Sequence, residues 1–342
     1  MKKIITIMAF LLLSYSLNAQ KVGSTSMQFL SVIPSARAAG MGNAYVAIVH
    51  GVEGVFWNPA GVALTEGHEF SMTYNNWLFD TYQYALAYST LLGDIGSIGF
   101  QFQYNDYGSF EEAIVGGSNI FPGQEYPYLT GRVFKPYSYV VGLSYAKKLS
   151  DRFSTGLSIK YGHESLYDKK SLSITDVDGS ILDAKTSANV IIFDFGIHYN
   201  TGFKSIQMGA SVQNFGPDIK YAKDKSSVPM LFHVGIAADF IGPNSLFVEE
   251  QNNRLGLAFD IFQTNDYDQQ QHIGIEYEFN NIVTFRAGYK FNYDLEGLTF
   301  GFGIKQKLGL LKILLDYSYG VLDAEVGSFG NIHRISIGVG IL

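Results

Sequence analysis

The sequence contains no cysteine among its 342 residues. This absence excludes a disulfide framework, a thiolate nucleophile and a cysteine-ligated zinc site. Charged residues are also scarce, at 16% of the chain, whereas roughly 25% is usual in a soluble domain. The formal net charge is −7. A nucleic-acid partner is therefore not expected, because proteins that bind nucleic acids need basic patches.

Long apolar runs are absent after the first 20 residues. Within those 20 residues, Lys2 and Lys3 precede an apolar run over residues 4–13, and Leu17-Asn18-Ala19 follows. This pattern predicts a signal peptide over residues 1–19, cleaved after Ala19. The run is shorter than the roughly 20 residues of a transmembrane helix, and we expect no spanning helix in the mature chain. The expected mature protein is either soluble and exported or a membrane β-barrel.

Motifs that mark common catalytic sites are missing as well. The chain has no phosphate-binding loop ending in Lys-Ser or Lys-Thr, no HExxH and no GxSxG. Its seven histidines are scattered without metal-ligand spacing. Residues 176–183 resemble part of a calcium loop without its closing glutamate, and we interpret them as a hydrophilic loop. We expect no enzyme activity, metal or cofactor. A Ser–His–acid triad assembled across strands is the remote alternative.

From Glu69 onward, apolar and polar residues alternate. The clearest example is the C-terminal segment, residues 334–341, where isoleucine or valine occupies every second position. Residues 283–292 and 298–305 repeat the pattern. A period of two predicts strands with one apolar and one polar face.

Fourteen segments fit this pattern, and most have the length of a membrane-crossing strand. Such a strand needs roughly 9–11 residues, whereas soluble strands centre on about 5–6. The sequence therefore predicts an all-β fold, a 14-stranded antiparallel transmembrane β-barrel. The predicted strands are 68–77, 80–91, 95–107, 137–148, 152–165, 188–199, 205–215, 230–240, 254–264, 270–280, 283–293, 296–307, 310–320 and 332–342.

The connections between these strands alternate between short and long. Short turns and long loops are expected at the periplasmic and extracellular sides of an outer-membrane barrel, respectively. Links 108–136 and 166–187 are the longest of the expected long loops. Three links depart from the alternation: 241–253 is expected to be short and is long, whereas 265–269 and 294–295 are expected to be long and are short.

The polar face of the predicted strands carries charges of both signs. In a hydrated or plugged lumen these side chains can pair, whereas in the dry core of a soluble sandwich each unpaired charge is costly. The pattern therefore favours a barrel with a polar interior. The predicted inward charges are Lys160, Asp194, Asp239, Asp260, Glu276, Glu278, Arg286, Lys290, Lys305, Asp316 and Arg334.

A small, glycine-rich stretch, Ala36 to Gly61, precedes the first strand. Its only charged residues are Arg37 and Glu53, and a solvated arm would be expected to carry more charge. Its glycines interrupt any long helix, and Asn58-Pro59 is a turn signal. We predict that residues 20–67 form a plug segment inside the barrel of residues 68–342. An ordinary surface arm is the alternative.

Residues 28–61 resemble the start of the PorV/PorQ family and, more distantly, that of the FadL-type fatty-acid channels. The resemblance rests on ARAAGMGNA at residues 36–44 and WNPAG at residues 57–61, with Phe29-Leu30 before them. Residues 214–217 and 228–229 add to it. Many relatives carry acidic residues where this chain has HGVEG at residues 50–54. The resemblance implies a 14-stranded outer-membrane barrel with an internal N-terminal segment. The plug-forming positions it implies are Arg37, Gly40, Met41, Gly42, Asn58, Pro59 and Gly61.

The resemblance implies two alternative functions. PorV-like proteins are non-enzymatic parts of type IX secretion that shuttle or anchor cargo, whereas FadL-like proteins admit hydrophobic molecules. The expected location is the outer membrane. The expected partners are membrane lipid and other secretion proteins or exported cargo, with a hydrophobic ligand in the alternative. Link 108–136 is the expected partner or ligand loop, because it carries Phe110, Phe121, Tyr126, Tyr128 and Phe134.

Overall fold

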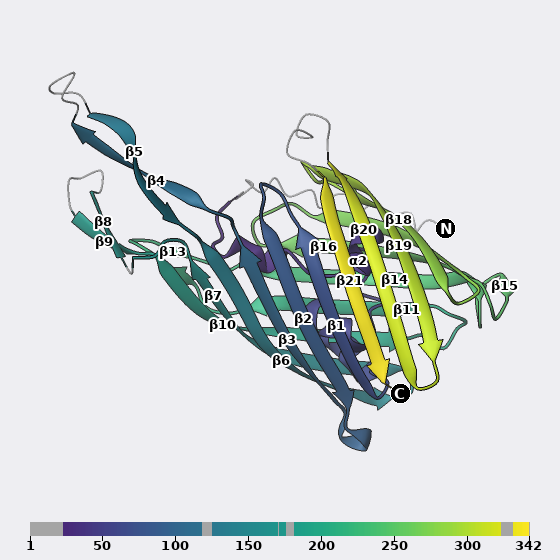
Figure 1. Cartoon of the computed structure of the whole chain (residues 1–342). Coiled ribbons are helices and arrows are strands. Elements are labelled where there is room, and N and C mark those ends of the chain that lie inside the picture. Colours follow the sequence, from purple (N-terminus) through teal and green to yellow (C-terminus); the bar gives the residue numbers. More distant parts are fainter. Residues whose placement is uncertain (1–22, 118–124, 170, 176–180, 323–330, 342) are drawn as a thin grey trace, which may run out of the picture.

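The computed structural model describes residues 23–117, 125–169, 171–175, 181–322 and 331–341. The expected signal peptide and residues 176–180 of the calcium-like stretch lie outside these ranges. Within them, the chain forms an antiparallel β-barrel, and the short helices of the N-terminal segment lie inside it (Figure 1). The predicted fold class is confirmed.

The barrel wall consists of the predicted fourteen long strands. Every strand boundary lies within two residues of its predicted position. The strands are β1 (His68–Asn76), β2 (Tyr82–Leu91), β3 (Ser97–Asp106), β6 (Tyr137–Ser150), β7 (Phe153–Ser165), β10 (Ser187–Asn200), β11 (Gln207–Phe215), β14 (Leu231–Gly242), β16 (Arg254–Thr264), β17 (Gln270–Phe279), β18 (Val283–Phe291), β19 (Glu296–Leu308), β20 (Leu311–Leu322) and β21 (Ile332–Ile341).

Consecutive wall strands pair with one another, and β1 pairs with β21 to close the barrel. In this closing pair, His68 faces Ile341 and Asn76 faces His333. The first wall strand therefore begins at the same end of the barrel at which the last one finishes, as an even strand number requires. We call this end the turn end and the opposite end the hairpin end.

Side chains alternate between the two faces of the wall as predicted. On β19, Phe300 is 45% exposed, whereas its neighbour Thr299 is 2% exposed. Phe302, Ile335 and Ile337 are also exposed on the outer face. The wall is thus apolar outside and polar inside, which is the arrangement of a barrel surrounded by lipid.

The two longest links contain hairpins that extend beyond the wall. Strands β4 (Phe110–Gly117) and β5 (Glu125–Phe134) pair only with each other, as do β8 (Ser171–Thr175) and β9 (Ile181–Lys185). Figure 1 shows the β4–β5 hairpin projecting far from the hairpin end. A third small pair, β12 (Ile219–Lys220) with β13 (Lys225–Ser226), lies between β11 and β14. The sequence predicted these links as loops, and their own strands are a finding of the structure.

The link 241–253 is long because it folds back on the wall. Its strand β15 (Val248–Glu249) pairs in parallel with the end of β14. Part of the link therefore extends the sheet at the turn end, where a short turn was expected. The links 265–269 and 292–295 at the hairpin end are short, against the expected alternation.

The N-terminal segment contains only short helices: η1 (Gln28–Ser31), α2 (Ala36–Gly40), η2 (Gly51–Glu53), α3 (Gly54–Trp57) and η3 (Pro59–Leu64). Among the described residues, no helix is both long and apolar enough to cross a membrane. Buried side chains of the segment, among them Val55, Trp57 and Val62, pack with the wall residues Ala85, Ala87 and Ala146. The apolar core therefore lies inside the barrel, between the segment and the wall.

Candidate functional site

The first part of the N-terminal segment is built around helix α2. The Oγ of Ser35 accepts a hydrogen bond from the backbone N–H of Ala38 at 3.0 Å and so caps the helix. Beyond the helix, Gly42 and Asn43 have φ values of +63° and +66°. Glycine and asparagine are the residues that best tolerate this left-handed conformation. The Gly-Met-Gly-Asn sequence therefore ends the helix with a tight turn.

Glycines on both sides bring the segment's backbone directly against the wall. A Cβ on Gly40 would lie 2.9 Å from the Cα of Gly301 in β19. A Cβ on Gly288 in β18 would lie 2.1 Å from the backbone N of Gly42. The carbonyl oxygen of the buried Met41 lies equally close to the backbone of the next wall strand, β17. Any side chain at these glycines would separate the two backbones.

The second part of the segment is held through Asn58. Its Nδ2 donates to the carbonyl oxygens of Val46 at 3.1 Å and of Ile197 in β10 at 3.0 Å. Its Oδ1 accepts from a backbone N–H at 3.1 Å, and the residue is fully buried. Pro59 follows as the first residue of η3, where its missing N–H costs no helical hydrogen bond. A Cβ on Gly61 would lie 2.8 Å from a backbone oxygen.

Inward polar side chains of the wall complete the segment's backbone hydrogen bonds. Gln101 and Gln213 donate to carbonyl oxygens of helix α3 at 2.5 and 2.7 Å. Asp260 accepts from the backbone N–H groups of Tyr45 and Val46 at 2.7 and 2.8 Å. The sequence analysis placed Asp260 inside the barrel but missed both glutamines. Both glutamines occupy inward-facing positions on predicted strands, and this position was the sequence signal that could have identified them.

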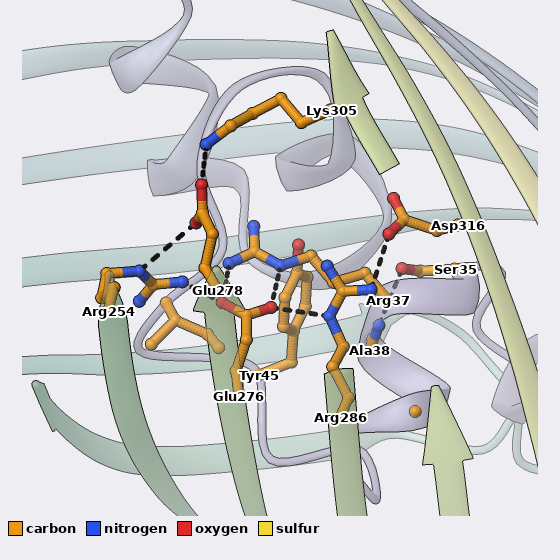
Figure 2. Close-up of polar contacts among 12 residues, drawn as sticks. Ser35, Arg37, Ala38, Tyr45, Arg254, Glu276, Glu278, Arg286, Lys305 and Asp316 are labelled. Carbon is orange, nitrogen blue, oxygen red and sulfur yellow. Dashed lines mark hydrogen bonds and ion pairs between the residues drawn. The ribbon is translucent and has the colours of Figure 1, made fainter. Parts of the chain in front are cut away.

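A charged cluster ties the segment to the wall (Figure 2). Arg37 binds Glu276 in β17 through two hydrogen bonds of 2.9 Å. Glu276 also contacts Arg254 and accepts from Arg286 at 2.6 Å, and Arg286 donates to Asp316 at 2.6 Å. We call the whole set the anchor cluster: Arg37, Asp239, Arg254, Glu276, Glu278, Arg286, Lys305 and Asp316.

The anchor cluster is electrically balanced, since four cations meet four carboxylates. Seven of its members come from wall strands, and Arg37 alone comes from the N-terminal segment. Buried ion pairs contribute little net stability but are costly to break, so they fix geometry. The cluster therefore determines where helix α2 sits in the lumen.

A second polar group supports Arg37 from within the segment. Ser35 donates to Glu53 at 2.9 Å, and the hydroxyl of Tyr45 donates to the other oxygen of the same carboxylate. The guanidinium carbon of Arg37 lies 5.5 Å from the centre of the Tyr45 ring. Burial raises the pKa of Glu53. Glu53, the single acidic residue of the 50–54 stretch, therefore has a hydrogen-bond donor on each carboxylate oxygen.

Cavities remain on both sides of the N-terminal segment. A cavity of 850 Å³ lies at the turn end, lined partly by the anchor cluster. Two cavities of 290 and 240 Å³ lie at the hairpin end and share the lining residues Gln28, Val32, Trp77 and Leu78. Among the described residues, no group of three or more His, Asp or Glu side chains is placed to hold a metal ion.

The predicted binding loop contains the β4–β5 hairpin. Phe110 and Phe134 stack at its base, with ring centres 5.9 Å apart. Tyr128 is exposed further along β5. Tyr126 belongs to the same strand, whereas Phe121 lies outside the described residues. Among the predicted loop residues whose side chains the structure describes, Phe110 and Phe134 are in ring contact.

Two aliphatic residues that the sequence analysis did not single out are also exposed on this hairpin. Leu129 is 61% exposed and Val133 is 57% exposed. Phe110 and Tyr128 are exposed as well, and we call these four apolar side chains, which lie on both faces of the hairpin, the hairpin patch. Strands β4 and β5 have no pairing partner besides each other among the described strands. The patch therefore projects into solvent.

A polar contact braces the hairpin against residues 166–169, which lead into β8. Arg132 donates to both carboxylate oxygens of Asp168, at 2.7 and 2.6 Å. Its guanidinium carbon also lies 5.3 Å from the centre of the Tyr167 ring. The Tyr167 hydroxyl donates to Glu112 on β4, and its ring packs on Phe134. These contacts link the bases of the two hairpins.

Solved structures with a similar fold include one named as a transporter and one named as a channel. The chain superposes on the Pseudomonas putida toluene transporter TodX with a TM-score of 0.51 and 13% identity, over 89% of this chain and 96% of that one. The chain superposes on the monoaromatic hydrocarbon channel CymD with a TM-score of 0.52 and 13% identity, over 91% of this chain and 97% of that one. It superposes on a Pseudomonas aeruginosa FadL homologue with a TM-score of 0.51 and 10% identity, over 91% of this chain and 98% of that one. At this identity, the likeness establishes the fold alone.

No curated protein sequence matches the chain. A family model described as "Type IX secretion system protein PorV" matches residues 15–261, which is more than half of the sequence. This match includes the N-terminal segment and the wall from β1 into β16. It agrees with the resemblance seen in residues 28–61. The chain therefore belongs to the PorV family of type IX secretion system proteins, with a FadL-like barrel fold.

Proposed function

We propose that this barrel is a non-enzymatic outer-membrane component of type IX secretion that presents its β4–β5 hairpin to a protein partner. Short turns face the periplasm in outer-membrane barrels and long loops face outward. On this basis the hairpin end faces the cell exterior. The partner is another secretion component or the exported cargo itself.

The hairpin patch is the observation that carries this proposal. Its four apolar side chains are exposed on a hairpin that stands clear of the wall. Aromatic and aliphatic residues of this kind form the cores of protein interfaces. The brace between Arg132 and Asp168 restrains the base of the hairpin, and a restrained surface loses less entropy when it binds.

The filled lumen supports a role that does not depend on free passage. The N-terminal segment contacts wall strands around the barrel, from β17 to β19 through its glycines and at β10 through Asn58. Arg37 also holds the segment to the wall through its ion pair with Glu276. A passenger protein would have to displace all of these contacts to pass through the barrel.

The test compares two changes in a strain that has the secretion system. The first deletes residues 110–134 and joins β3 to β6 by the remaining loop. The second replaces Tyr128, Leu129 and Val133 by serine and keeps the hairpin backbone. We expect both to leave the barrel folded and inserted, to retain cargo in the periplasm and to abolish copurification of the partner.

A matched control removes the same number of exposed apolar side chains at the opposite end of the barrel. Replacing Leu92, Ile95 and Phe203 by serine should leave secretion unchanged, because these side chains are exposed at the turn end. Normal secretion by the folded hairpin deletion would contradict the proposal.

A second candidate function, uptake of a small hydrophobic molecule, is favoured by the two cavities at the hairpin end. Both are lined by aromatic side chains, with Trp77 common to the two. The similar structures named above are a toluene transporter and a monoaromatic hydrocarbon channel. If the hairpin deletion leaves secretion intact and lowers the uptake of a hydrocarbon or fatty acid, this function replaces the first.

A further inference from the structure

The β4–β5 hairpin has two open edges, because among the described strands each of its strands pairs only with the other. Every wall strand, by contrast, has a neighbour on both sides. The hairpin extends beyond the wall (Figure 1), and an isolated two-stranded hairpin is at best marginally stable in water. An open edge also exposes a row of unpaired N–H and C=O groups. A third strand would satisfy these groups and stabilise the hairpin.

A β-bulge divides the hairpin into a basal and a distal part. The register shifts between Glu111 and Ala113, so that residues 130–132 of β5 lie opposite a single residue of β4. Gly131, inside the bulge, has a φ of +77°, which glycine adopts without strain. The brace to residues 166–169 holds the basal part. The distal part, in which residues 113–117 pair with β5, stands beyond that brace and carries the edges that a partner can reach.

A proline in the distal part indicates which backbone groups face outward. Pro127 of β5 lies opposite Val115 of β4. In an antiparallel pair, residues that exchange hydrogen bonds alternate with residues whose N–H and C=O point away from the partner strand. Proline has no N–H, so it fits the ladder at a position of the second kind. Val115 is then of the same kind, as are Ala113 and Gly117, and each presents an N–H and a C=O on the outer edge of β4.

The two edges of the distal part are not equally open. Along β5, the outward row at residues 125, 127 and 129 lacks its middle N–H because of the proline, and it begins with the charged Glu125. Proline and charge are means by which proteins protect edge strands from further pairing. Residues 113–117 of β4, Ala-Ile-Val-Gly-Gly, contain neither. The outer edge of β4 is therefore the one available to another strand.

We propose that the partner of the hairpin adds an extended segment as a third strand along the outer edge of β4, at residues 113–117. This inference rests on the proposed function and specifies how the partner is recognised. Main-chain hydrogen bonds to Ala113, Val115 and Gly117 supply affinity, as in other cases of strand addition. The occupant is a segment of another protein.

The hairpin patch is continuous with this edge and adds selectivity. An added strand directs alternate side chains to the two faces of the hairpin. The hairpin patch also presents apolar side chains on both faces, with Phe110 on β4 itself. The added segment is therefore expected to carry apolar residues on both of its faces.

Val115→Pro tests the edge without removing the hairpin. The substitution deletes an N–H that faces away from β5, so the ladder between β4 and β5 keeps its hydrogen bonds. Proline also favours an extended conformation for the residue before it. We expect the affinity of the full-length barrel for its copurified partner to fall by about tenfold, the upper range for one lost hydrogen bond, and cargo to accumulate in the periplasm.

The matched control is Glu125→Pro, which makes the same change in the outward row of β5. The hairpin patch is intact in both variants. Because the β5 edge is already interrupted by Pro127, partner affinity and secretion should equal those of the parent protein.

Amide hydrogen exchange locates the added strand directly. It is measured on the full-length barrel alone and in the copurified complex. The amides of Ala113, Val115 and Gly117 should exchange fast in the free barrel and slowly in the complex. The amides of Ile114 and Gly116 face β5, and the complex should change their exchange much less.

Three outcomes would overturn the proposal. Parent-like partner affinity in a folded Val115→Pro variant would mean that the β4 edge is not used. Loss of affinity in Glu125→Pro alone would place the added strand on β5. Slow exchange of the three outward amides in a homodimer of the barrel would make a second copy the occupant. In each case the serine replacement of the hairpin patch and the hairpin deletion still test the secretion role, so the two proposals fail separately.

Discussion

Glu276 is the residue on which the anchor cluster depends, because three arginines share its carboxylate. Glu276→Gln would leave Arg37, Arg254 and Arg286 facing one another without that charge. We expect the free energy of unfolding to fall by about 3–5 kcal/mol, the usual cost of breaking a buried ion pair. Urea unfolding of the barrel in lipid vesicles measures this change.

The control for this substitution is Glu249→Gln. Glu249 pairs with Lys204 at 2.7 Å, but the two side chains are 64% and 38% exposed. Exposed ion pairs are screened by solvent, so the unfolding midpoint should not move. An equal loss of stability in both variants would show that burial does not distinguish the two pairs.

Gly288 tests how closely the segment is packed on the wall. A Cβ at this position would lie 2.1 Å from the backbone N of Gly42. Gly288→Ala should destabilise the barrel by about 1–3 kcal/mol, the typical cost of overpacking, and should expose the bond after Arg37 to trypsin. In the matched control, Gly340→Ala, the nearest atom would lie 3.6 Å away. The trypsin digestion pattern of Gly340→Ala should stay that of the parent protein.

At the scale of elements, the N-terminal segment runs the length of the lumen. Near its described start, Ser24 and Ser26 bond to Ser226 and Ser227, which precede β14 at the hairpin end. At its other end, Gly67 leads into β1 at the turn end. The segment therefore crosses the barrel once, from the hairpin end to the turn end.

This path predicts opposite accessibilities for two introduced cysteines. The natural chain has none, so each variant carries a single reactive thiol. Ser24→Cys should react with a membrane-impermeant maleimide on intact cells, because Ser24 is exposed at the hairpin end. Asp94→Cys, in the turn after β2, should react only after the cells are opened. Equal labelling of both on intact cells would contradict the orientation.

The brace of the β4–β5 hairpin should depend on pH only under acidic conditions. The hydrogen bond from Arg132 lowers the pKa of Asp168. A carboxyl with a lowered folded pKa stabilises above its unfolded pKa, about 3.9 for Asp, and loses that contribution as the pH falls through the folded value. Protease cleavage of the hairpin should therefore stay constant from neutral pH down to about 4 and rise below it. Asp168→Asn should show faster cleavage already at neutral pH.

The wall strands could be read from the sequence because the membrane imposes one rule on all of them. Each must alternate over about 9–11 residues, and this pattern survives in a single sequence. The hairpins in links 108–136 and 166–187 obey no such rule, and neither was predicted as strands. The exposure of Leu129 and Val133 follows from the hairpin's position, which residue type does not determine.

The candidate site was predictable only in part, for a related reason. Arg37 and Glu276 were each placed inside the barrel, but their pairing joins residues 239 positions apart. Gln213 was missed because a glutamine on an inward face gives no signal of what it will contact. Its partners are backbone carbonyls of helix α3, and backbone groups are the same in every sequence.

At the scale of the whole molecule, the barrel is stabilised from two sides. Inside, the N-terminal segment supplies most of the apolar core. Outside, the apolar residues of the alternating strands remain exposed and meet lipid. A polar substitution on the outer face should therefore cost stability in a bilayer according to its depth. A polar substitution beyond the apolar band should cost little.

One strand provides both halves of that comparison. Phe302 lies at the centre of β19 and Leu308 at its turn end, and both side chains are exposed on the outer face. Phe302→Arg should lower the free energy of unfolding in vesicles by about 2–4 kcal/mol, and Leu308→Arg by about 0–1 kcal/mol, because the penalty for arginine falls from the midplane to the interface. Urea titration of both variants in the same lipid measures the difference. Equal effects would mean that the lipid band does not centre on the middle of β19. No effect at Phe302 would mean that this face of the strand does not meet lipid at all.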